Sequence, residues 1–155
     1  MENIRFDDVE KLRSKISKDF GAWSKPIAVT QEKIQQFADV TGDHQWIHLD
    51  VERCKRESPF GGPVAHGFLT LGFVAALEIE NDWQVTGFRN VVNYGANKLR
   101  FISPVPAGAS VHGHNRIIAV EPKPQGTQMT VETNVHVVGN DKPALIYEGI
   151  FLYVK

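Results

Sequence analysis

The sequence predicts an α+β fold in which an antiparallel sheet curls around one central helix. Three observations support this prediction. The run from Phe68 to Leu77 has no charged side chain and carries apolar groups on every side of a helix, which is typical of a helix buried all round. The second half of the chain consists of strand-like segments joined by short turn sequences, which favours antiparallel neighbours. Within that half, residues 127–138 alternate between an apolar and a polar face.

The N-terminal part begins the architecture. Residues 6–16 have apolar positions at helical spacing and predict a short amphipathic helix. Residues 23–29 predict a first strand, and Pro26 within it favours a place at a sheet edge. Thr30 is a suitable N-cap for the next helix, which is expected to end just before Gly42 because glycine suits a helix C-terminus.

The middle of the chain changes character twice. Residues 43–64 mix polar, aromatic, glycine and proline residues without a sustained period, so they predict an ordered covering loop with short turns. The apolar helix of residues 68–77 follows, and the acidic residues after it are expected at the surface. Strands are predicted over residues 86–94 and 96–102, with a bulge or close turn at Gly95 between them.

The C-terminal part predicts three further strands, over residues 110–120, 127–138 and 144–154, separated by the turn sequences EPKPQG and GNDKP. We expect residues 1–155 to form a single domain. The edges of such a sheet need covering, and pairing with a second copy of the chain would cover one of them. We therefore expect a homodimer.

Composition narrows the classes of function. The chain has 155 residues, 42% hydrophobic and 23% charged, as in an ordinary globular domain. Its formal net charge of −1 gives no overall attraction to nucleic acid. Cys54 is the only cysteine, which excludes an internal disulfide and a thiolate-rich zinc site. Neither a signal peptide nor a membrane-spanning run is present, so we expect a cytoplasmic protein that binds neither membrane nor nucleic acid.

The segments most informative about function flank the predicted loop. GDHQWIH (residues 42–48) presents the carboxylate of Asp43 and the imidazole of His48 on an irregular segment after a helix. GGPVAHG (residues 61–67) leads into the apolar helix, whose first backbone N–H groups are free to bind developing negative charge. An acid, a base and an anion-stabilising helix end are what addition of water to an activated double bond requires.

These segments resemble the signature of MaoC-like, (R)-specific enoyl-CoA hydratases. The family motif Gly-Asp-x-Asn-Pro-(aliphatic)-His-x-Asp is similar to residues 42–50, and residues 60–67 are similar to the segment leading into the family's central helix. Residues 93–105 (NYGANKLRFISPV) resemble a strand segment of the NodN-like branch. The resemblance covers residues 37–108 in order. It implies the hotdog fold, a sheet wrapped around a long helix, usually working as a dimer.

The resemblance also implies roles for individual residues. Asp43 and His48 match the catalytic pair, and Gly67 matches the glycine whose backbone N–H faces the thioester oxygen. The chain departs from the family at Gln45-Trp46, where Asn-Pro is most common. Gln reaches further than Asn, and Trp lacks the fixed φ of proline, so the departure bears on loop geometry and substrate range more than on the pair itself.

Further residues are candidates for contacting the substrate: Gln45, Trp46, His66, Phe68, Lys98 and Arg100. Lys98 and Arg100 share a strand face and could bind the phosphates of coenzyme A, although a solvated edge explains them equally well. Trp46, Phe60 and Phe68 could line an acyl tunnel, with ordinary core packing as the alternative. His66 is expected to orient the loop or cap the helix. A hydroxyl found in some relatives falls near Thr70 or Gly72.

Metal binding is not expected. His44, His48 and His66 belong to no close carboxylate–histidine set with recognisable helix spacing. His112 and His114 lie at i, i+2 on a strand, as in the metal-binding strands of cupin barrels, but Glu121 follows at a longer spacing, so a solvated strand face is favoured. No metal or redox cofactor is expected, and coenzyme A enters as part of the substrate.

The predicted function is syn addition of water to a trans-2-enoyl-CoA, giving an (R)-3-hydroxyacyl-CoA, or the reverse dehydration. Asp43 and His48 would bind and activate the water, and the N–H of Gly67 would stabilise the enolate-like transition state. An acyl carrier protein could replace coenzyme A as the carrier. Two alternatives stay open: an acyl-CoA thioesterase on the same fold, and a non-catalytic acyl-CoA-binding partner subunit, which the Gln45-Trp46 departure allows.

Overall fold

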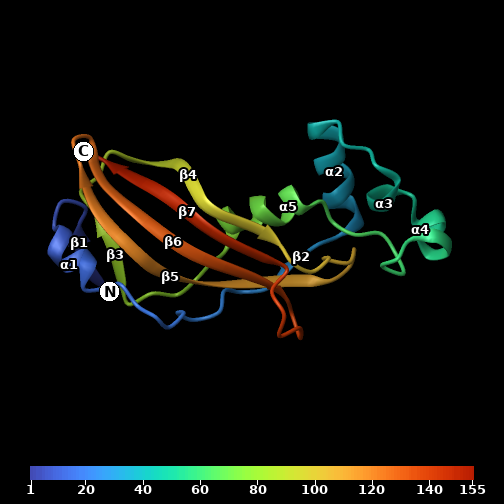
Figure 1. Cartoon of the computed structure of the whole chain (residues 1–155), viewed down its shortest axis with the longest axis horizontal. Helices are drawn as coiled ribbons and strands as arrows, with labels where there is room; N and C mark the ends of the chain where they lie inside the picture. Colours follow the sequence, from blue (N-terminus) through green and yellow to red (C-terminus); the bar gives the residue numbers. More distant parts are fainter.

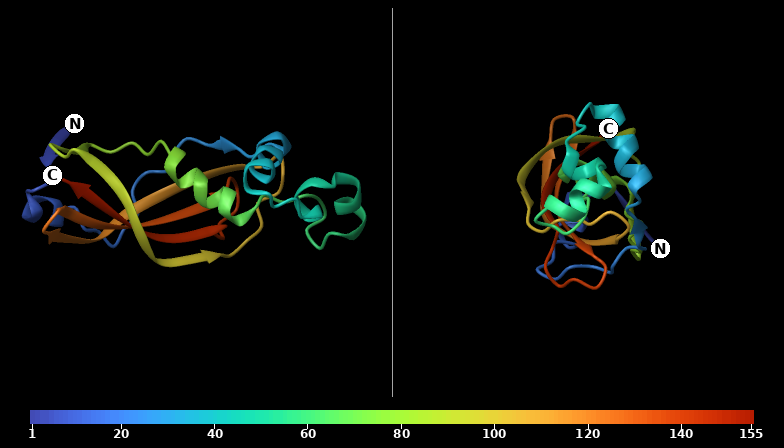
Figure 2. Two further views of the ribbon diagram at one scale, coloured as in Figure 1. Left: turned by 90° about the horizontal axis from the view of Figure 1, so that it is seen from above. Right: turned by 90° about the vertical axis from the view of Figure 1, so that its right-hand side faces the viewer.

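The computed structural model describes residues 1–155, and its main feature is a curled five-stranded antiparallel sheet (Figure 1). The strands lie in the order β2 (Ile27–Ala28), β5 (Ser110–Lys123), β6 (Gly126–Val137), β7 (Leu145–Val154) and β4 (Asn90–Phe101). Every neighbouring pair is antiparallel. The sheet curls around a helix that lies against its concave face (Figure 2), so the predicted α+β arrangement is confirmed.

The strands agree with the sequence in position and differ in extent. β5, β6 and β7 occupy the three predicted C-terminal segments. β4 continues through Gly95, where its pairing with β7 shifts register between Asn93 and Gly95, so the glycine marks a bulge within one strand. β2 lies at the sheet edge, as Pro26 indicated, but only Ile27 and Ala28 pair with β5.

The helix before residues 42–48, α2 (Gln31–Thr41), has the predicted boundaries. The Thr30 hydroxyl accepts the N–H of Lys33, which satisfies one of the free donors of the first turn. Gly42 ends the helix in the left-handed conformation, with φ 78°. This turn fixes the direction in which the chain enters the site.

Residues 43–64 contain more regular structure than the sequence predicted. Two short helices, α3 (Trp46–Leu49) and α4 (Val51–Glu57), replace part of the expected loop, so the prediction of turns alone was wrong for these residues. The Asp50 carboxylate accepts the N–H of Arg53 and caps α4. The two helices lie at the end of the molecule opposite both termini (Figure 1).

The central helix is shorter and more exposed than predicted. α5 (Gly67–Gly72) has six residues and continues as a 3₁₀ turn, η1 (Phe73–Ala76). Thr70 is the only buried residue in α5 and η1 together, and Phe68 is 65% exposed. The prediction of a helix buried all round was therefore wrong for the single chain: one side packs on the sheet, and the other side is apolar and open.

The N-terminal residues cover the end of the sheet that lies away from α3 and α4 (Figure 1). β1 (Glu2–Arg5) pairs in parallel with β3 (Trp83–Thr86), and α1 (Val9–Arg13) is shorter than the predicted helix over residues 6–16. Ile4 and Leu12 pack against inward-facing residues of β5 and β6 in a second hydrophobic cluster. Both termini lie at this end (Figure 1), so the candidate site described below occupies the other end.

The two edges of the sheet differ. Beside β5, the backbone N–H groups of Ser17, Gly21 and Ser24 donate to its carbonyls, so the chain itself covers this edge beyond β2. The outer edge of β4 has no partner strand, and its Val92 and Tyr94 side chains are exposed. No helix in the structure combines the length and apolar character needed to span a membrane.

Candidate active site

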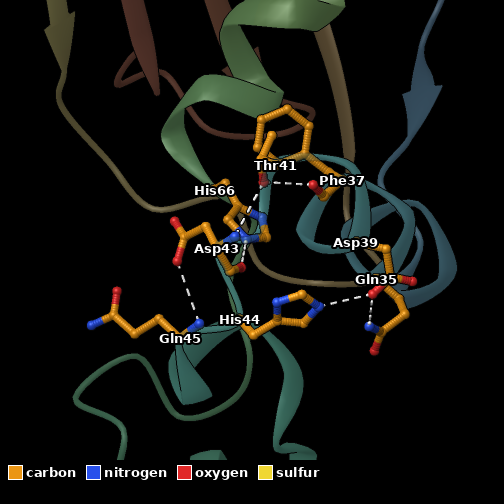
Figure 3. Close-up of polar contacts among 8 residues, drawn as sticks. All are labelled: Gln35, Phe37, Asp39, Thr41, Asp43, His44, Gln45 and His66. Carbon is orange, nitrogen blue, oxygen red and sulfur yellow. Dashed lines mark hydrogen bonds and ion pairs between the residues drawn. The ribbon is translucent and has the colours of Figure 1, made fainter.

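Asp43 follows the left-handed turn at Gly42 and lies on the exposed segment between α2 and α3. Its Oδ1 accepts the N–H of Gln45 at 3.4 Å, which turns the carboxylate away from the exposed Asp39–His44 pair on the other side of the segment (Figure 3). One carboxylate oxygen therefore remains free for other partners.

His48 lies in α3 and is held by two hydrogen bonds, one through its side chain and one through its backbone carbonyl. Its side chain is buried, and its Nδ1 lies 2.6 Å from the carbonyl oxygen of Val64. Because a carbonyl can only accept, Nδ1–H donates, and Nε2 carries a lone pair when the ring is neutral. The backbone carbonyl of His48 accepts the side-chain amide of Gln31 at 2.7 Å, which ties α3 to α2.

The environment of His48 favours its neutral form. Burial lowers the pKa of His48, and the neighbouring His66 lowers it further, whereas the hydrogen bond to Val64 and the charge of Asp43 raise it; burial is the largest effect. A neutral imidazole with a bare Nε2 can accept a proton at pH 7. The ring is therefore in the state that a general base requires.

The side chains of Asp43 and His48 converge. One ligand-capable atom from each, together with one from His66, lie within 4.8 Å of one another. One water can bridge two acceptors at this separation with hydrogen bonds of about 2.8 Å each. The arrangement can thus hold a water molecule between a carboxylate and a neutral imidazole.

The same three side chains are the only group of their kind that approaches a metal-ligand set. The spacing of these residues along the sequence did not indicate that they meet, and the absence of a bound metal stays a prediction. The rings of His48 and His66 are stacked, with centroids 3.8 Å apart and planes 25° apart. The nitrogen lone pairs of the two imidazoles lie in nearly parallel ring planes. They therefore cannot both point at one ion about 2.0–2.1 Å from each nitrogen, so this geometry does not favour a metal.

A cavity of about 330 Å³ lies beside His48, whereas Asp43 lies outside its lining and reaches the site through its approach to His48. Its lining comes from α3, α5, the end of β4 and the loop after it: Ile47, His48, Phe60, Val64, Ala65, Gly67, Thr70, Phe101, Ile102, Ser103, Pro104, Val105 and Ala144. Most of these residues are apolar. The cavity thus joins an apolar compartment to the imidazole of His48, as ligand sites commonly do.

Gly67 brings a backbone donor to the cavity. It is the first residue of α5, so its N–H has no acceptor within the helix. A Cβ at this position would lie 3.0 Å from two ring atoms of Phe101, so the close approach of the ring requires glycine. Since α5 is short, the anion-stabilising capacity rests on this N–H rather than on the dipole of a long helix.

The predicted substrate-contacting residues separate into two groups. Phe60 lines the cavity, and His66 lies against the pair. Five others lie outside the cavity lining: Gln45, Trp46, Phe68, Lys98 and Arg100. The Arg53 guanidinium lies 4.2 Å from the ring centroid of Trp46, and Phe68 packs edge-on against Phe101 at the surface. Lys98 and Arg100 are exposed on β4, so the structure does not bring them to the cavity.

Sequence reasoning left other residues of the site unassigned. Thr70 is buried, lines the cavity and directs its hydroxyl to the carbonyl of His66 at 3.5 Å. Thr70 lies three residues after Gly67, so both lie on one helix face. Of the two positions considered for the hydroxyl, only Thr70 carries one, and its side chain lines the cavity. Phe101 and Ile102 reach the cavity from the end of β4. No sequence signal marks the Val64 carbonyl that orients His48.

The second histidine group is half-buried and packs against an aromatic ring. His112 and His114 both stack on the Trp23 ring, at centroid distances of 4.1 and 3.9 Å. Burial lowers the pKa of both histidines. Glu121 pairs instead with Lys123 at 2.7 Å. The predicted solvated face is thus partly covered by Trp23, and the two histidines and Glu121 form no metal-ligand group.

Comparison with known proteins identifies the family. The family model described as MaoC like domain matches residues 15–140. The chain is 43% identical over 150 residues to 3-hydroxyacyl-thioester dehydratase Z of Mycobacterium tuberculosis, covering 96% of this chain and 97% of that protein. It is 40% identical over 149 residues to nodulation protein N of Rhizobium meliloti, covering 94% and 88%.

Among solved structures, an (R)-hydratase from A. caviae involved in PHA biosynthesis is similar in fold, with a TM-score of 0.68 at 20% sequence identity. The match covers 88% of this chain and 97% of that one. The resemblance seen in the sequence is thereby confirmed: the chain has the hotdog fold and belongs to the family of MaoC-like dehydratase domains.

Proposed function

We propose that the protein catalyses the reversible syn addition of water to a trans-2-enoyl thioester, giving an (R)-3-hydroxyacyl thioester. The observation that carries this proposal is the convergence of Asp43 and His48 beside a cavity lined by Gly67. The names of the similar proteins, a 3-hydroxyacyl-thioester dehydratase and an (R)-hydratase, support the same reaction class and leave its direction open.

In the hydration direction, the pair holds one water against the β-carbon of the substrate. The carboxylate of Asp43 accepts one hydrogen of the water, and Nε2 of His48 accepts the other. As the water oxygen bonds to the β-carbon, its proton passes to Nε2, and the double-bond electrons move toward the thioester carbonyl. The imidazolium then returns the proton to the α-carbon on the same face. Positioned proton transfer of this kind is worth about 10²–10⁴-fold in rate.

The N–H of Gly67 supplies the electrostatic part of the mechanism. Negative charge develops on the thioester oxygen when the water adds, and a backbone donor aimed at that oxygen stabilises the transition state more than the ground state. The apolar walls of the cavity exclude bulk water and so strengthen this interaction. No redox cofactor is needed, because water addition leaves the total oxidation state of the substrate unchanged.

The test follows loss of enoyl absorbance with crotonyl-CoA. Asp43→Asn and His48→Gln are each expected to lower kcat/KM by about 100-fold or more, with the thermal unfolding midpoint close to that of the unsubstituted protein. Asp39→Asn is the matched control, because Asp39 is an exposed carboxylate beside a histidine on the neighbouring segment (Figure 3). It is expected to keep full activity.

The same assay separates the alternatives. A thioesterase would release free thiol without consuming the enoyl group by hydration. A non-catalytic subunit would bind the thioester without turnover, and replacing His48 would not matter. The departure at Gln45-Trp46 kept the second alternative open, and neither side chain belongs to the cavity lining.

We also propose that the working form is a homodimer paired through β4. The outer edge of β4 is open, and Val91, Val92 and Tyr94 on it are exposed beside the uncovered side of α5. Pairing here would cover both features at once. Light scattering is expected to give twice the chain mass, and Val92→Asp to shift it to one chain. Val138→Asp, at an exposed apolar residue beyond β6, should leave the dimer intact.

A further inference from the structure

The ring of His66 lies against both members of the proposed pair. It is 3% exposed, and its Nε2 lies 2.9 Å from the backbone carbonyl oxygen of Asp43 (Figure 3). The same ring stacks on His48 with the centroids 3.8 Å apart. Phe37 of α2 packs on it at 4.9 Å. One buried side chain therefore contacts the segment that carries the carboxylate and the ring that carries the base.

The backbone of His66 ties this contact to the start of α5. Its carbonyl accepts the N–H groups of Leu69 and Thr70, and Gly67 follows directly. The three parts proposed to act in the reaction thus meet at one residue: the carboxylate segment through Nε2, the base through the ring face, and the backbone donor through the peptide bond.

A purely structural role explains this ring poorly. The His66 side chain makes no hydrogen bond that caps α5, so helix capping does not account for it. Nε2–H must donate to the Asp43 carbonyl, which leaves Nδ1 as an acceptor, and Nδ1 is buried with no partner. A buried acceptor without a partner is destabilising, and an apolar ring would fill the same space without that penalty.

We propose that His66 is a positioning residue: its N–H fixes the backbone of Asp43, and its face fixes the ring plane of His48, so that both point at the shared water. This inference rests on the proposed hydration. A shift of about 1 Å in either group is enough to lose about 100-fold in rate. A side chain that sets both positions therefore affects turnover without contacting the substrate itself.

Two variants separate the contacts. His66→Phe keeps a ring that can stack on His48 but has no N–H donor, and His66→Gln keeps an amide N–H for the Asp43 carbonyl but has no ring. Each is expected to lower kcat by about 10- to 100-fold with KM changed by about twofold or less. His136→Asn is the matched control: His136 is also buried and its Nδ1 contacts a backbone carbonyl, that of Asn140, at 3.0 Å, but its ring packs against Trp23 and His114 instead of against the pair.

A second readout needs no turnover. Long-range ¹H–¹⁵N correlation of the imidazoles in the resting protein is expected to show His48 as the Nδ1–H tautomer and His66 as the Nε2–H tautomer. The titratable groups facing His48 are Asp43 and His66. His66 lowers the pKa of His48 and Asp43 raises it, so the His48 titration is expected to move upward in His66→Gln and downward in Asp43→Asn. The acid limb of kcat/KM is expected to follow the first shift.

The outcomes are distinguishable. If the unsubstituted protein hydrates no enoyl thioester, the proposed function fails. The tautomers and titrations still test whether His66 positions Asp43 and His48. If His66→Gln and His66→Phe fold normally, keep the original kcat and leave the His48 titration in place, His66 has only a structural role. If these variants do not fold, the unsubstituted protein still decides the question: finding His48 as the Nε2–H tautomer, or His66 as the Nδ1–H tautomer, overturns the inference.

Discussion

Replacing Gly67 by alanine is expected to raise or preserve stability while lowering activity. Gly67 begins α5 with φ outside the positive region, so its backbone accepts an L side chain without strain. Alanine is favoured over glycine in a helix by about 1 kcal/mol, with less at the first position. Stability arguments alone would therefore select alanine here.

The local geometry predicts the opposite effect on catalysis. The new methyl would lie 3.0 Å from two atoms of the Phe101 ring and 3.2 Å from a third, closer than ordinary contact. The ring is 47% exposed and can move, so folding survives, but the movement disturbs the cavity wall beside the Gly67 N–H. Alanine keeps the backbone N–H, so the effect comes from displacement of that group and of the cavity wall. A shift of about 1 Å in a positioned group can cost about 100-fold in rate, so we expect kcat/KM to fall by about 10- to 100-fold.

The control for this experiment is Gly72→Ala. Gly72 ends the same helix, and a Cβ there would meet nothing within 4 Å. It should match Gly67→Ala in thermal unfolding and keep full hydration of crotonyl-CoA. If Gly67→Ala is stable and also fully active, the proposed importance of the close contact between Gly67 and Phe101 is refuted.

Three further predictions concern pH and the turn before the site. Since burial lowers the pKa of His48, the acid limb of kcat/KM is expected to have its midpoint below the ordinary histidine value of about 6.5, and a midpoint above it would contradict a buried neutral base. His112 and His114 also have pKa values lowered by burial; the unfolded chain then binds protons more readily, so the stability these groups contribute is present above about pH 6.5 and is lost as the pH falls below it. The double variant His112→Gln/His114→Gln should flatten this decline in unfolding midpoint, and an unchanged decline would assign it to other groups. Gly42→Ala places a Cβ at φ 78° and should cost about 1–2 kcal/mol of unfolding free energy in urea, whereas an unchanged midpoint would show that the turn relaxes freely.

The elements that the sequence located well are those with local signals. The Thr30 cap and the Gly42 exit defined α2 to within a residue, because both signals act through hydrogen bonds within the same few residues. The late strands were found because turn sequences separate them and side chains alternate along β6. The bulge at Gly95 followed from the absence of a side chain.

The elements that were missed depend on contacts between distant parts of the chain. β1 pairs with β3 across about eighty residues of sequence, and no local pattern encodes such a partner. α3 and α4 are four and seven residues long, too short to show an apolar period, and helices of this length form only when capped and packed. The apolar composition of α5 was interpreted as complete burial, but composition does not show whether the same chain or a second one provides the cover.

The candidate site shows the same division. Asp43, His48 and Gly67 were identified from their spacing within two short motifs. The structure brings Asp43 close to His48, and His48 lines a cavity together with Gly67. The contacts that orient them come from loop closure: the Val64 carbonyl reaches His48 from the chain just before α5, and His66 reaches both the Asp43 backbone and the His48 ring. These contacts have no sequence signature, so only the folded chain reveals them.

The central claim, that Asp43 and His48 act on one water as a unit, is tested most directly by a double-mutant cycle. Crotonyl-CoA hydration is measured for Asp43→Asn, His48→Gln and the double variant under the same conditions. Residues that act as a unit are strongly non-additive, so the double variant is expected to be no slower than the slower single variant, within about threefold. Losses in kcat/KM that multiply would show that the two side chains act independently, and would contradict the account.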